Sequence, residues 1–217
     1  MPSVDMIARL KITLERVTPP VMRLIEVPLD LRLDRLHLTL QAAFGWTDTH
    51  LWEFRAGGVA WGPRDPYEEF GDEPLDASRA TLRDVLEDTG VKTIRYIYDF
   101  GDNWQHAIRV GRLGAPDPRS TYPMLLDAQG RCPPEDIGGP FGYAKFLEAL
   151  ADPRHSSRHV DLRERFGEGE FDAAAVDVVA IARKLEALGA SWARRRTGAR
   201  KKPGPTPGSS SKAVTGD

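Results

Sequence analysis

One short segment of the sequence gathers carboxylates, an amide, an indole and an imidazole around a single predicted turn. Its candidate functional residues are Asp99, Asp102, Asn103, Trp104 and His106. Aspartate and asparagine in a turn also hydrogen-bond to their own backbone, so Asp102 and Asn103 have a structural interpretation. For Asp99 and His106 a structural and a functional role both stay open.

The register of the predicted β-hairpin decides between these roles. A loop of residues 102–103 places Asp99 opposite His106, as in an acid–base pair or a metal site with its supporting carboxylate. A loop of residues 101–103 instead places Tyr98 opposite His106, which puts the imidazole on an aromatic face. The sequence is compatible with either register.

A second polar cluster lies in the segment 131–143, directly before a predicted helix. Two prolines stiffen this loop, and its glycines free the backbone to approach another surface. Backbone N–H groups at a helix N-terminus suit a carboxylate or a phosphate. Alternatively, the aspartate caps the helix and the cysteine is a small buried side chain. The candidate residues are Cys132, Glu135, Asp136 and Tyr143.

A divalent metal needs several ligands, and the sequence offers them only in separate segments. The candidates are His50, His106, Cys132 and Asp136, with Asp99 as a further carboxylate. Neither Cys-x-x-Cys nor His-Glu-x-x-His spacing occurs. A metal cofactor is therefore expected only if folding brings these segments together. His37 falls on the apolar side of a predicted helix, which is typical of a hydrogen-bonded core residue.

The hydrophobic pattern predicts the elements that position these residues. Strands are predicted at 8–14, 21–27, 50–55, 59–61, 93–100 and 104–110, and helices at 33–44, 81–86, 141–150, 157–166 and 174–188. The last helix is predicted to begin after a cap at Asp172 and to end at Gly189. Segments 62–76 and 111–139 are predicted to be irregular. Strands and helices do not alternate regularly, so we expect a two-layer, single-domain α+β fold: a mostly antiparallel sheet with helices packed on one face.

Composition and charge limit the class of protein. The chain has 217 residues, of which 41% are hydrophobic and 29% charged, and one cysteine. These values exclude collagen-like, fully disordered and disulfide-stapled proteins. No apolar run is long enough to span a membrane, and the N-terminus lacks the pattern of a secretory signal. We therefore expect a cytoplasmic protein without a membrane partner.

Charge is divided unevenly between residues 1–190 and residues 191–217. The second part carries seven basic side chains and one acidic one, which leaves 23 basic and 31 acidic side chains in the first. An acidic body does not favour a folded surface that grips nucleic acid. We expect one domain over 1–190 and a disordered tail over 191–217, either a solubilising extension or a nonspecific contact to phosphate backbones. The basic residues for that contact are Arg194, Arg195, Arg196, Arg200, Lys201 and Lys202.

Several segments together resemble the plasmid pRiA4b ORF-3-like family over about residues 6–180. They are 10–14 (LKITL) before the prolines at 19–20, 36–37 (LH), 44–51 (FGWTDTHL), 70–73 (FGDE), 98–106 (YDFGDNWQH) and 132–140 (CPPEDIGGP). The resemblance implies an α+β fold in a bacterial and archaeal family, often found near plasmids and transposable elements, with no firmly attached activity. Some members carry a resolvase-like label, which needs an activated serine and a basic DNA-binding domain; this acidic body offers neither.

Two residues depart from the family pattern. Arg32 stands where a threonine or serine is common, which removes a good cap for the first helix. Gln105 stands where an acidic residue is often found, so Gln105 itself is not expected to act as an acid or base.

Two main functions and one weaker alternative are compatible with the sequence, and whether the chain is an enzyme stays open. The leading hypothesis is a non-enzymatic binding or accessory module linked to mobile DNA, with a protein or small-molecule ligand in a polar pocket between the hairpin 99–106 and the loop 132–142. The alternative is a metal-dependent hydrolase or nuclease that uses His50, Asp99 and His106. The weaker alternative is a nucleic-acid-associated protein anchored by its basic tail.

Overall fold

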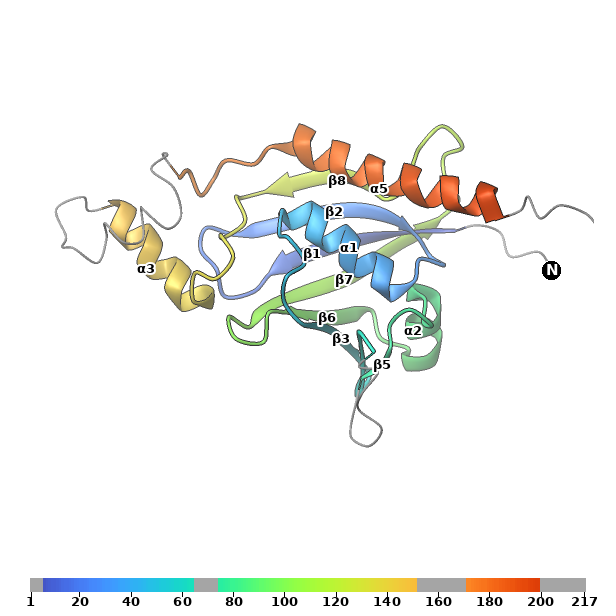
Figure 1. Cartoon of the computed structure of the whole chain (residues 1–217), viewed down its shortest axis with the longest axis horizontal. Coiled ribbons are helices and arrows are strands. Elements are labelled where there is room, and N and C mark those ends of the chain that lie inside the picture. The colour runs from blue at the N-terminus through green and yellow to red at the C-terminus, as the bar shows by residue number, and fades with distance from the viewer. Residues whose placement is uncertain (1–5, 65–73, 152–170, 200–217) are drawn as a thin grey trace, which may run out of the picture.

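One sheet organises the residues that the computed structural model describes, which are 6–64, 74–151 and 171–199 (Figure 1). Its strands are β1 (Ile7–Leu14), β2 (Val21–Pro28), β3 (Trp52–Ala56), β4 (Val59–Gly62), β5 (Leu75–Asp76), β6 (Thr93–Tyr98), β7 (Trp104–Gly114) and β8 (Met124–Gln129). They lie in the order β5-β4-β3-β6-β7-β1-β2-β8, and the pairings are antiparallel except that of β4 with β5. The described helices are α1 (Leu33–Phe44), α2 (Leu82–Thr89), α3 (Gly139–Ala151) and α5 (Val178–Ala199).

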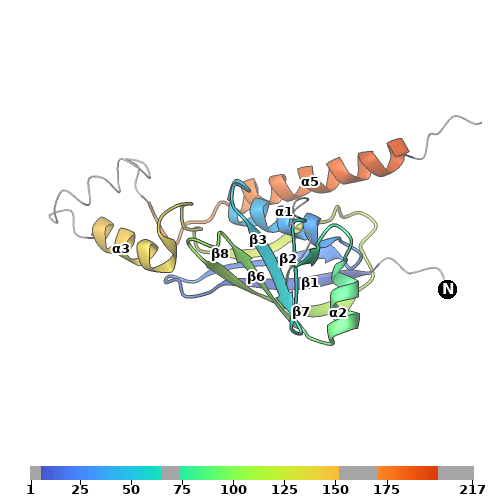
Figure 2. The same ribbon diagram turned by 60° about the horizontal axis from the view of Figure 1, so that its bottom comes forward.

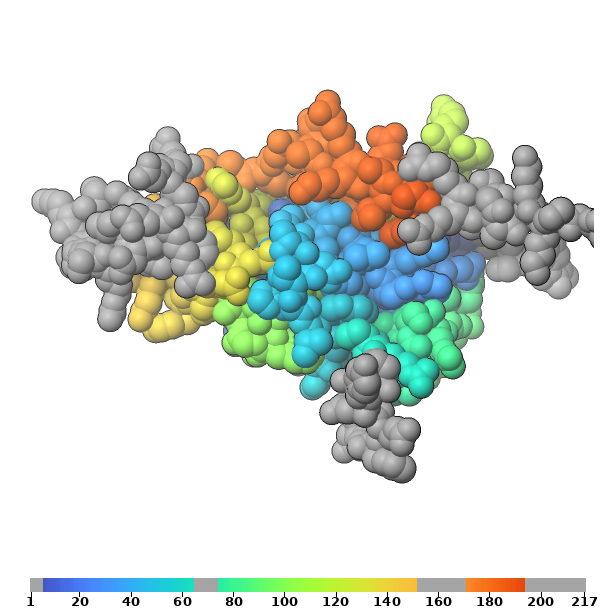
Figure 3. Space-filling model, in the orientation of Figure 1, coloured from blue at the N-terminus to red at the C-terminus, as the bar shows by residue number. Residues whose placement is uncertain are grey.

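The helices form the second layer and extend the molecule at its ends. Helix α1 lies over one face of the sheet, and α5 lies beside it, in contact with α1 and with the edge strand β8 (Figures 2 and 3). Helices α2 and α3 lie at opposite ends of the sheet (Figure 1). The expected α+β fold with a mostly antiparallel sheet is therefore confirmed.

Strand β1 forms the middle of the core because its apolar residues alternate. Leu10, Ile12 and Leu14 are at most 2% exposed, and β1 pairs with β2 on one side and β7 on the other. A period of two places alternate side chains on the same face of a strand. Here that face is covered by the helical layer, as the pattern predicted.

Helix α1 ends where the sequence indicated and leads directly to the candidate site. Leu36 and Leu40 on its apolar side are at most 1% exposed. The chain leaves the helix at Gly45, whose φ of 87° belongs to the left-handed region that glycine adopts without steric cost. Residues 46–51 follow, and this segment carries His50.

The segment 111–139, predicted to be irregular, contains the end of β7 and the whole of β8. Within the described residues, strand β8 pairs with β2 alone, at the edge of the sheet, and all six of its side chains are exposed or half-buried. An edge strand with little burial shows no clear alternation of apolar residues. The prediction was therefore wrong for residues 111–114 and 124–129, and residues 115–123 and 130–138 are irregular as predicted.

Helix α5 begins later and continues further than predicted. Its first turn is capped by Asp177, whose Oδ1 accepts a hydrogen bond from the Ala180 N–H (2.8 Å), rather than by Asp172. It also continues through Gly189 to Ala199 and so crosses the predicted boundary between domain and tail. The helix predicted at 157–166 lies outside the described residues, and so do residues 65–73 of the predicted loop 62–76.

Candidate metal centre

The loop between β6 and β7 is longer than either register predicted from the sequence. Tyr98 lies opposite Trp104, so the loop is the whole stretch between them. Both predicted registers, which placed Asp99 or Tyr98 opposite His106, are therefore wrong. Asp99 and Asn103 close the loop with φ of 57° and 55°, a left-handed backbone that these residue types tolerate better than most.

Asp99 is the first residue of this loop and is only 8% exposed. Its Oδ1 accepts hydrogen bonds from the N–H groups of Gly101 (3.0 Å) and Asp102 (3.2 Å). Its own N–H donates to the carbonyl of Leu51 (2.9 Å), which fixes the loop beside the segment that carries His50. The other carboxylate oxygen, Oδ2, lies 3.8 Å from His50 Nε2.

His50 connects Asp99 to Asp136, a residue far along the chain. His50 Nε2 lies 3.3 Å from Asp136 Oδ1, and this buried nitrogen has no hydrogen-bond partner among the described residues. The His50 side chain is 27% exposed and that of Asp136 57%. The site is therefore closed on the Asp99 side and open to solvent on the Asp136 side.

The loop that carries Asp136 is held against the hairpin by close backbone contact. The Gly138 N–H donates to Asp102 Oδ2 (3.1 Å). A Cβ on Gly139, whose φ is 66°, would lie 2.2 Å from the Asp102 carbonyl oxygen, so only glycine fits there. In Figure 3 the segments around His50, the hairpin and this loop meet on one face. The two polar segments singled out in the sequence therefore do come together.

The three side chains form a donor set that fits a divalent cation. One ligand atom from each of His50, Asp99 and Asp136 lies within 4.8 Å of the others. Donors about 2.0–2.2 Å from an ion lie about 3–4 Å from one another, so small side-chain shifts suffice. One imidazole and two carboxylates suit Zn²⁺ or Mn²⁺ better than Ca²⁺ or Mg²⁺, which prefer oxygen alone. His50 Nε2 supports this fit, because it is buried and has no hydrogen-bond partner among the described residues.

Glu135 positions the neighbouring Asp136 and takes part in a separate hydrogen-bond network. Its Oε1 accepts from the Tyr98 hydroxyl and its Oε2 from the Thr47 hydroxyl, both at 2.5 Å. Burial, with the hydrogen bond to Glu135, raises the pKa of Tyr98 to about 12. Tyr98 therefore stays protonated and donates to Glu135. Through its second hydrogen bond, to Thr47, Glu135 connects the loop 132–142 to the segment 46–51.

His106 and Trp104 belong to the core rather than to the site. His106 is 0% exposed and packs edge-on against Phe44 and Trp46. Burial lowers the pKa of His106 to about 3, so its imidazole is neutral. Trp104 is also 0% exposed, and its indole lies near that of Trp46. The predicted grouping of His106 with His50 and Asp99 is wrong because β7 directs His106 into the core.

Cys132 and Tyr143 also lie apart from the three ligands. Cys132 lines a separate pocket together with Trp46, and burial raises the pKa of its thiol well above the ordinary value. A protonated thiol is a poor nucleophile and a poor metal ligand. Tyr143 is 1% exposed and packs against Phe171. Neither residue joins the described metal cluster.

His37 is a hydrogen-bonded core residue, as predicted. Its Nδ1 lies 2.8 Å from the Tyr96 hydroxyl and its Nε2 2.6 Å from Asp48 Oδ1. Its ring stacks on Trp52 at a centroid distance of 4.1 Å. The partnership with Asp48 could not be predicted, because Asp48 follows the helix with a left-handed φ of 58° and only this backbone turn brings its carboxylate back to His37.

The predicted nucleic-acid contacts receive no test from the structure. Residues 194–196 belong to helix α5, where the structure describes their backbone but not their side chains. Arg200, Lys201 and Lys202 lie outside the described residues. Across the described part of the chain, none of the helices has the length and apolar character needed to cross a membrane.

Comparison with known proteins places the chain among relatives from bacteria and archaea. A family model described as "Plasmid pRiA4b ORF-3-like protein" matches residues 6–180. The chain is 49% identical over 189 residues to "Uncharacterized protein y4hQ" of Sinorhizobium fredii, covering 87% of this chain and 95% of the relative. It also resembles the crystal structure of the protein of unknown function MM3350 from Methanosarcina mazei Go1, with a TM-score of 0.71 and 31% identity over 82% of this chain and 98% of the other.

Proposed function

The chain belongs to the plasmid pRiA4b ORF-3-like family, and we propose that it is a metal-dependent hydrolase whose divalent cation is held by His50, Asp99 and Asp136. The observation that carries this proposal is the convergence of one ligand atom from each of these residues within 4.8 Å. The three residues come from three segments far apart in the sequence.

The roles of the ligands follow from their burial and hydrogen bonds. Asp99 is fixed through Oδ1 by two backbone N–H groups, which leaves Oδ2 for the cation. His50 offers a buried Nε2 that has no hydrogen bond among the described residues. Asp136 is largely exposed and can follow the ion as it binds. The set is therefore rigid on one side and adaptable on the other.

The number of ligands and the exposure of Asp136 favour a reactive site over a structural one. Structural zinc sites use four protein ligands, whereas catalytic sites use three and keep a position open. A bound ion of this kind supplies Lewis acidity to water or to a carbonyl or phosphoryl oxygen. On that basis we favour hydrolysis as the class of reaction.

A binding module that uses the same ion without turnover is the second candidate. The observation in its favour is that Glu135, the carboxylate next to the ligands, already accepts hydrogen bonds from Tyr98 and Thr47. Asp102 of the hairpin is likewise engaged, because its Oδ2 accepts from the Gly138 N–H. A module would bind an oxygen ligand at the open side of the ion and release it unchanged.

Metal titration of the full-length protein tests the site. After removal of metal with a chelator, we expect one Mn²⁺ or Zn²⁺ to bind per chain by calorimetry. The variants His50→Ala, Asp99→Asn and Asp136→Asn should each weaken binding more than about tenfold, because each removes a donor or its charge. Asp99→Asn keeps an oxygen for the turn and isolates the metal effect from folding.

The control is Asp127→Asn, which removes an exposed carboxylate on β8 away from the site. It should leave metal affinity unchanged. Hydrolysis of p-nitrophenyl acetate and bis-p-nitrophenyl phosphate by the metal-loaded protein then separates the two candidates: turnover lost in the ligand variants supports the hydrolase, and stoichiometric metal without turnover supports the module. Unchanged metal affinity in all three ligand variants would refute both.

A further inference from the structure

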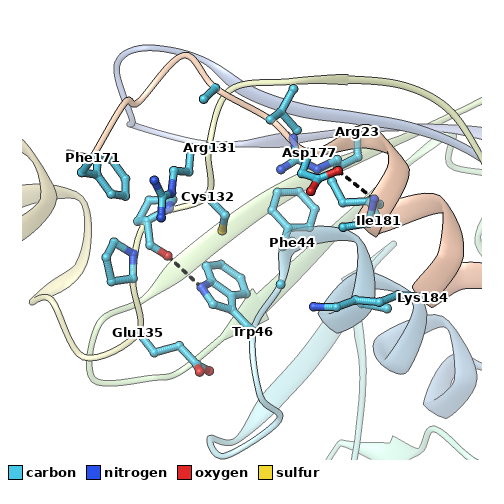
Figure 4. A pocket seen from close by; sticks show the side chains of 17 residues that line it. Arg23, Phe44, Trp46, Arg131, Cys132, Glu135, Phe171, Asp177, Ile181 and Lys184 are labelled. Atoms are coloured by element: carbon cyan, nitrogen blue, oxygen red, sulfur yellow. Dashed lines mark hydrogen bonds between the residues drawn. The ribbon is translucent and has the colours of Figure 1, made fainter. Parts of the chain in front are cut away.

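Trp46 and Cys132 line a pocket of about 550 Å³, and none of the three proposed metal ligands lines it. Its walls come from the end of α1, the loop around Cys132 and the first turns of α5 (Figure 4). This volume is typical of small-molecule sites. Three of the five charged side chains that line it are basic.

Arg23 on β2 is the most deeply buried of these residues, at 2% exposed. Its Nε donates to the carbonyl of Ala43 (2.8 Å), and its Nη1 donates to the carbonyls of Met22, Gln129 and Gly130 at 2.7–3.1 Å. These acceptors are neutral, so the positive charge has no counterion among the residues that the structure describes. No hydrogen bond within the described part of the chain uses Nη2, although Arg23 lines the pocket.

Two further cations line the same pocket without an ion pair. Arg131 lies over the ring of Phe171, with 4.4 Å from the guanidinium carbon to the ring centroid. Lys184 projects from α5 on the opposite side, as Figure 4 shows. Neither forms a salt bridge with another described residue. A buried guanidinium, with two exposed cations in the lining of the same pocket, makes an anion the natural complement.

The two carboxylates that line the pocket do not neutralise these cations. Glu135 accepts hydrogen bonds from Tyr98 and Thr47. Asp177 accepts from the Ala180 N–H through Oδ1 and thereby caps α5. Neither comes within salt-bridge distance of the three cations, so the pocket keeps a positive excess.

The apolar part of the pocket is aromatic. Phe44, Trp46 and Phe171 contribute to its lining, and aromatic walls of this kind favour a flat apolar ligand. We propose that this pocket binds a small organic anion, with its carboxylate or phosphate group among Arg23, Arg131 and Lys184 and an apolar ring against the aromatic side chains. This proposal is independent of the metal centre.

Phenyl phosphate is the probe, because it combines one ring with one phosphate group. Calorimetry on full-length, chelator-treated protein should give saturable binding, with inorganic phosphate and phenol binding more weakly because each lacks one half of the probe. Lys184→Gln and Arg131→Gln should each weaken binding by about threefold to tenfold, as expected when a partly exposed charge pair is lost. Arg23→Gln removes the guanidinium that donates to four backbone carbonyls, so the test does not depend on that variant.

Three matched variants make the result decisive. Asp177→Asn retains a capping side chain but removes a negative charge, so it should strengthen binding of phenyl phosphate. Arg183→Gln removes an exposed charge from α5 beside Lys184 but outside the pocket lining and should have no effect. His50→Ala should also have no effect.

Two results overturn the proposal: absence of saturable binding, and equal loss of binding in Lys184→Gln and Arg183→Gln. A loss confined to His50→Ala would assign phenyl phosphate to the metal centre and also overturn it. Failure of metal binding at His50 would leave this pocket untouched, so the two proposals fail separately.

Discussion

Three histidines in this chain have different chemical roles because their surroundings differ. His50 is partly exposed beside two carboxylates, and it is the one we assign to a metal ion. His37 is buried but hydrogen-bonded through both ring nitrogens. His106 is buried among aromatic rings, with its Nδ1 3.3 Å from the Tyr96 carbonyl oxygen. Residue type alone therefore does not identify the functional histidine.

Burial of His106 makes folding stability depend on pH. Its pKa is about 3 in the folded protein, against 6.5 for an unperturbed histidine. Between pH 6.5 and pH 3 this histidine is protonated in the unfolded chain but neutral in the folded protein. The free energy of unfolding therefore falls as the pH falls through this range. His106→Leu should remove this contribution, which is about 1.4 kcal/mol for each pH unit.

Urea denaturation at several pH values between 7 and 4, in the presence of a chelator, measures this effect. His37, whose pKa is also lowered by burial, contributes equally to wild type and variant and therefore cancels. The slope of unfolding free energy against pH should be smaller for the variant by about one proton. Parallel slopes would show that His106 is not buried as the structure has it.

Helix α1 and the hairpin β6–β7 position the candidate centre. The end of the helix could be predicted from the sequence, and the register of the hairpin could not. The apolar side of α1 and its end at Gly45 could be predicted because periodicity and a C-terminal glycine are local signals. The register of β6 with β7 could not, because a loop closed by two left-handed residues has no distinctive pattern. His50, Asp99 and Asp136 stood out as candidates, but only that register separates them from His106.

The contact between α3 and the hairpin should control metal affinity. Gly139→Ala places a Cβ 2.2 Å from the Asp102 carbonyl oxygen at φ 66°, whereas Gly90→Ala has the same strain, φ 67°, with nothing within 4 Å. Gly90→Ala should cost about 1–2 kcal/mol of stability from strain alone. Gly139→Ala should cost more and also weaken Mn²⁺ binding, because the loop that carries Asp136 must move away from Asp99.

Denaturation and metal titration of both variants separate strain from displacement. Stability should fall in each, and metal affinity only in Gly139→Ala. Equal behaviour of the two variants in both measurements would mean that the close approach at Gly139 does not hold the site together.

The two helices α1 and α2 begin side by side but are capped differently. Thr81 forms a capping box with Asp84 at the start of α2. Arg32 is the cap residue of α1, in extended conformation and without a side-chain cap. The first-turn N–H groups nevertheless have partners, since those of Leu33, Asp34 and Arg35 donate to the Ala80 carbonyl (2.9 Å), the Ala77 carbonyl (3.2 Å) and Asp34 Oδ1 (2.8 Å). Arg32→Ser and Arg32→Ala should therefore differ in stability by less than about 0.5 kcal/mol, the low end of a capping contribution.

The comparison with Arg32→Ala is needed because both variants lose the exposed pair with Asp34, which contributes little. The serine adds an acceptor, but the first turn has no unpaired N–H left for it. Thermal unfolding of the two variants measures the difference. A serine variant more stable than the alanine variant by about 1 kcal/mol would show that the backbone carbonyls of Ala77 and Ala80 do not hold this turn in solution.

At the scale of the whole molecule, the two proposed sites depend on segments that only the folded chain brings together. The metal centre joins the turn after α1, the hairpin and the loop before α3. The anion pocket joins β2, the end of α1 and α5. Arg23 was not a candidate from the sequence because its environment depends on Gln129 and Gly130 around the end of β8, a strand that was not predicted. The local hydrophobic pattern of the sequence therefore predicts most helices and strands, whereas the two proposed sites form only through contacts between segments that are far apart in the sequence.

Helix α5 completes this assembly, and Gly189 shows how closely it packs. A Cβ at this residue would lie 2.5 Å from the Tyr122 carbonyl oxygen. Replacing a glycine inside an exposed helix by alanine ordinarily stabilises it by about 1 kcal/mol. Because the helix must move off the segment before β8, Gly189→Ala should destabilise the protein instead. The sign of the change therefore measures whether α5 is docked as the structure has it.

Urea denaturation of Gly189→Ala gives this sign, with Ala182→Gly as the reference for helix propensity at an exposed residue of α5. Ala182→Gly should cost about 1 kcal/mol. Gly189→Ala should also lose stability, and it should weaken phenyl phosphate binding because Lys184 lies on the helix that shifts. A gain in stability for Gly189→Ala, with unchanged binding, would show that α5 stands clear of Tyr122 in solution and that the pocket wall it forms is not packed against the sheet.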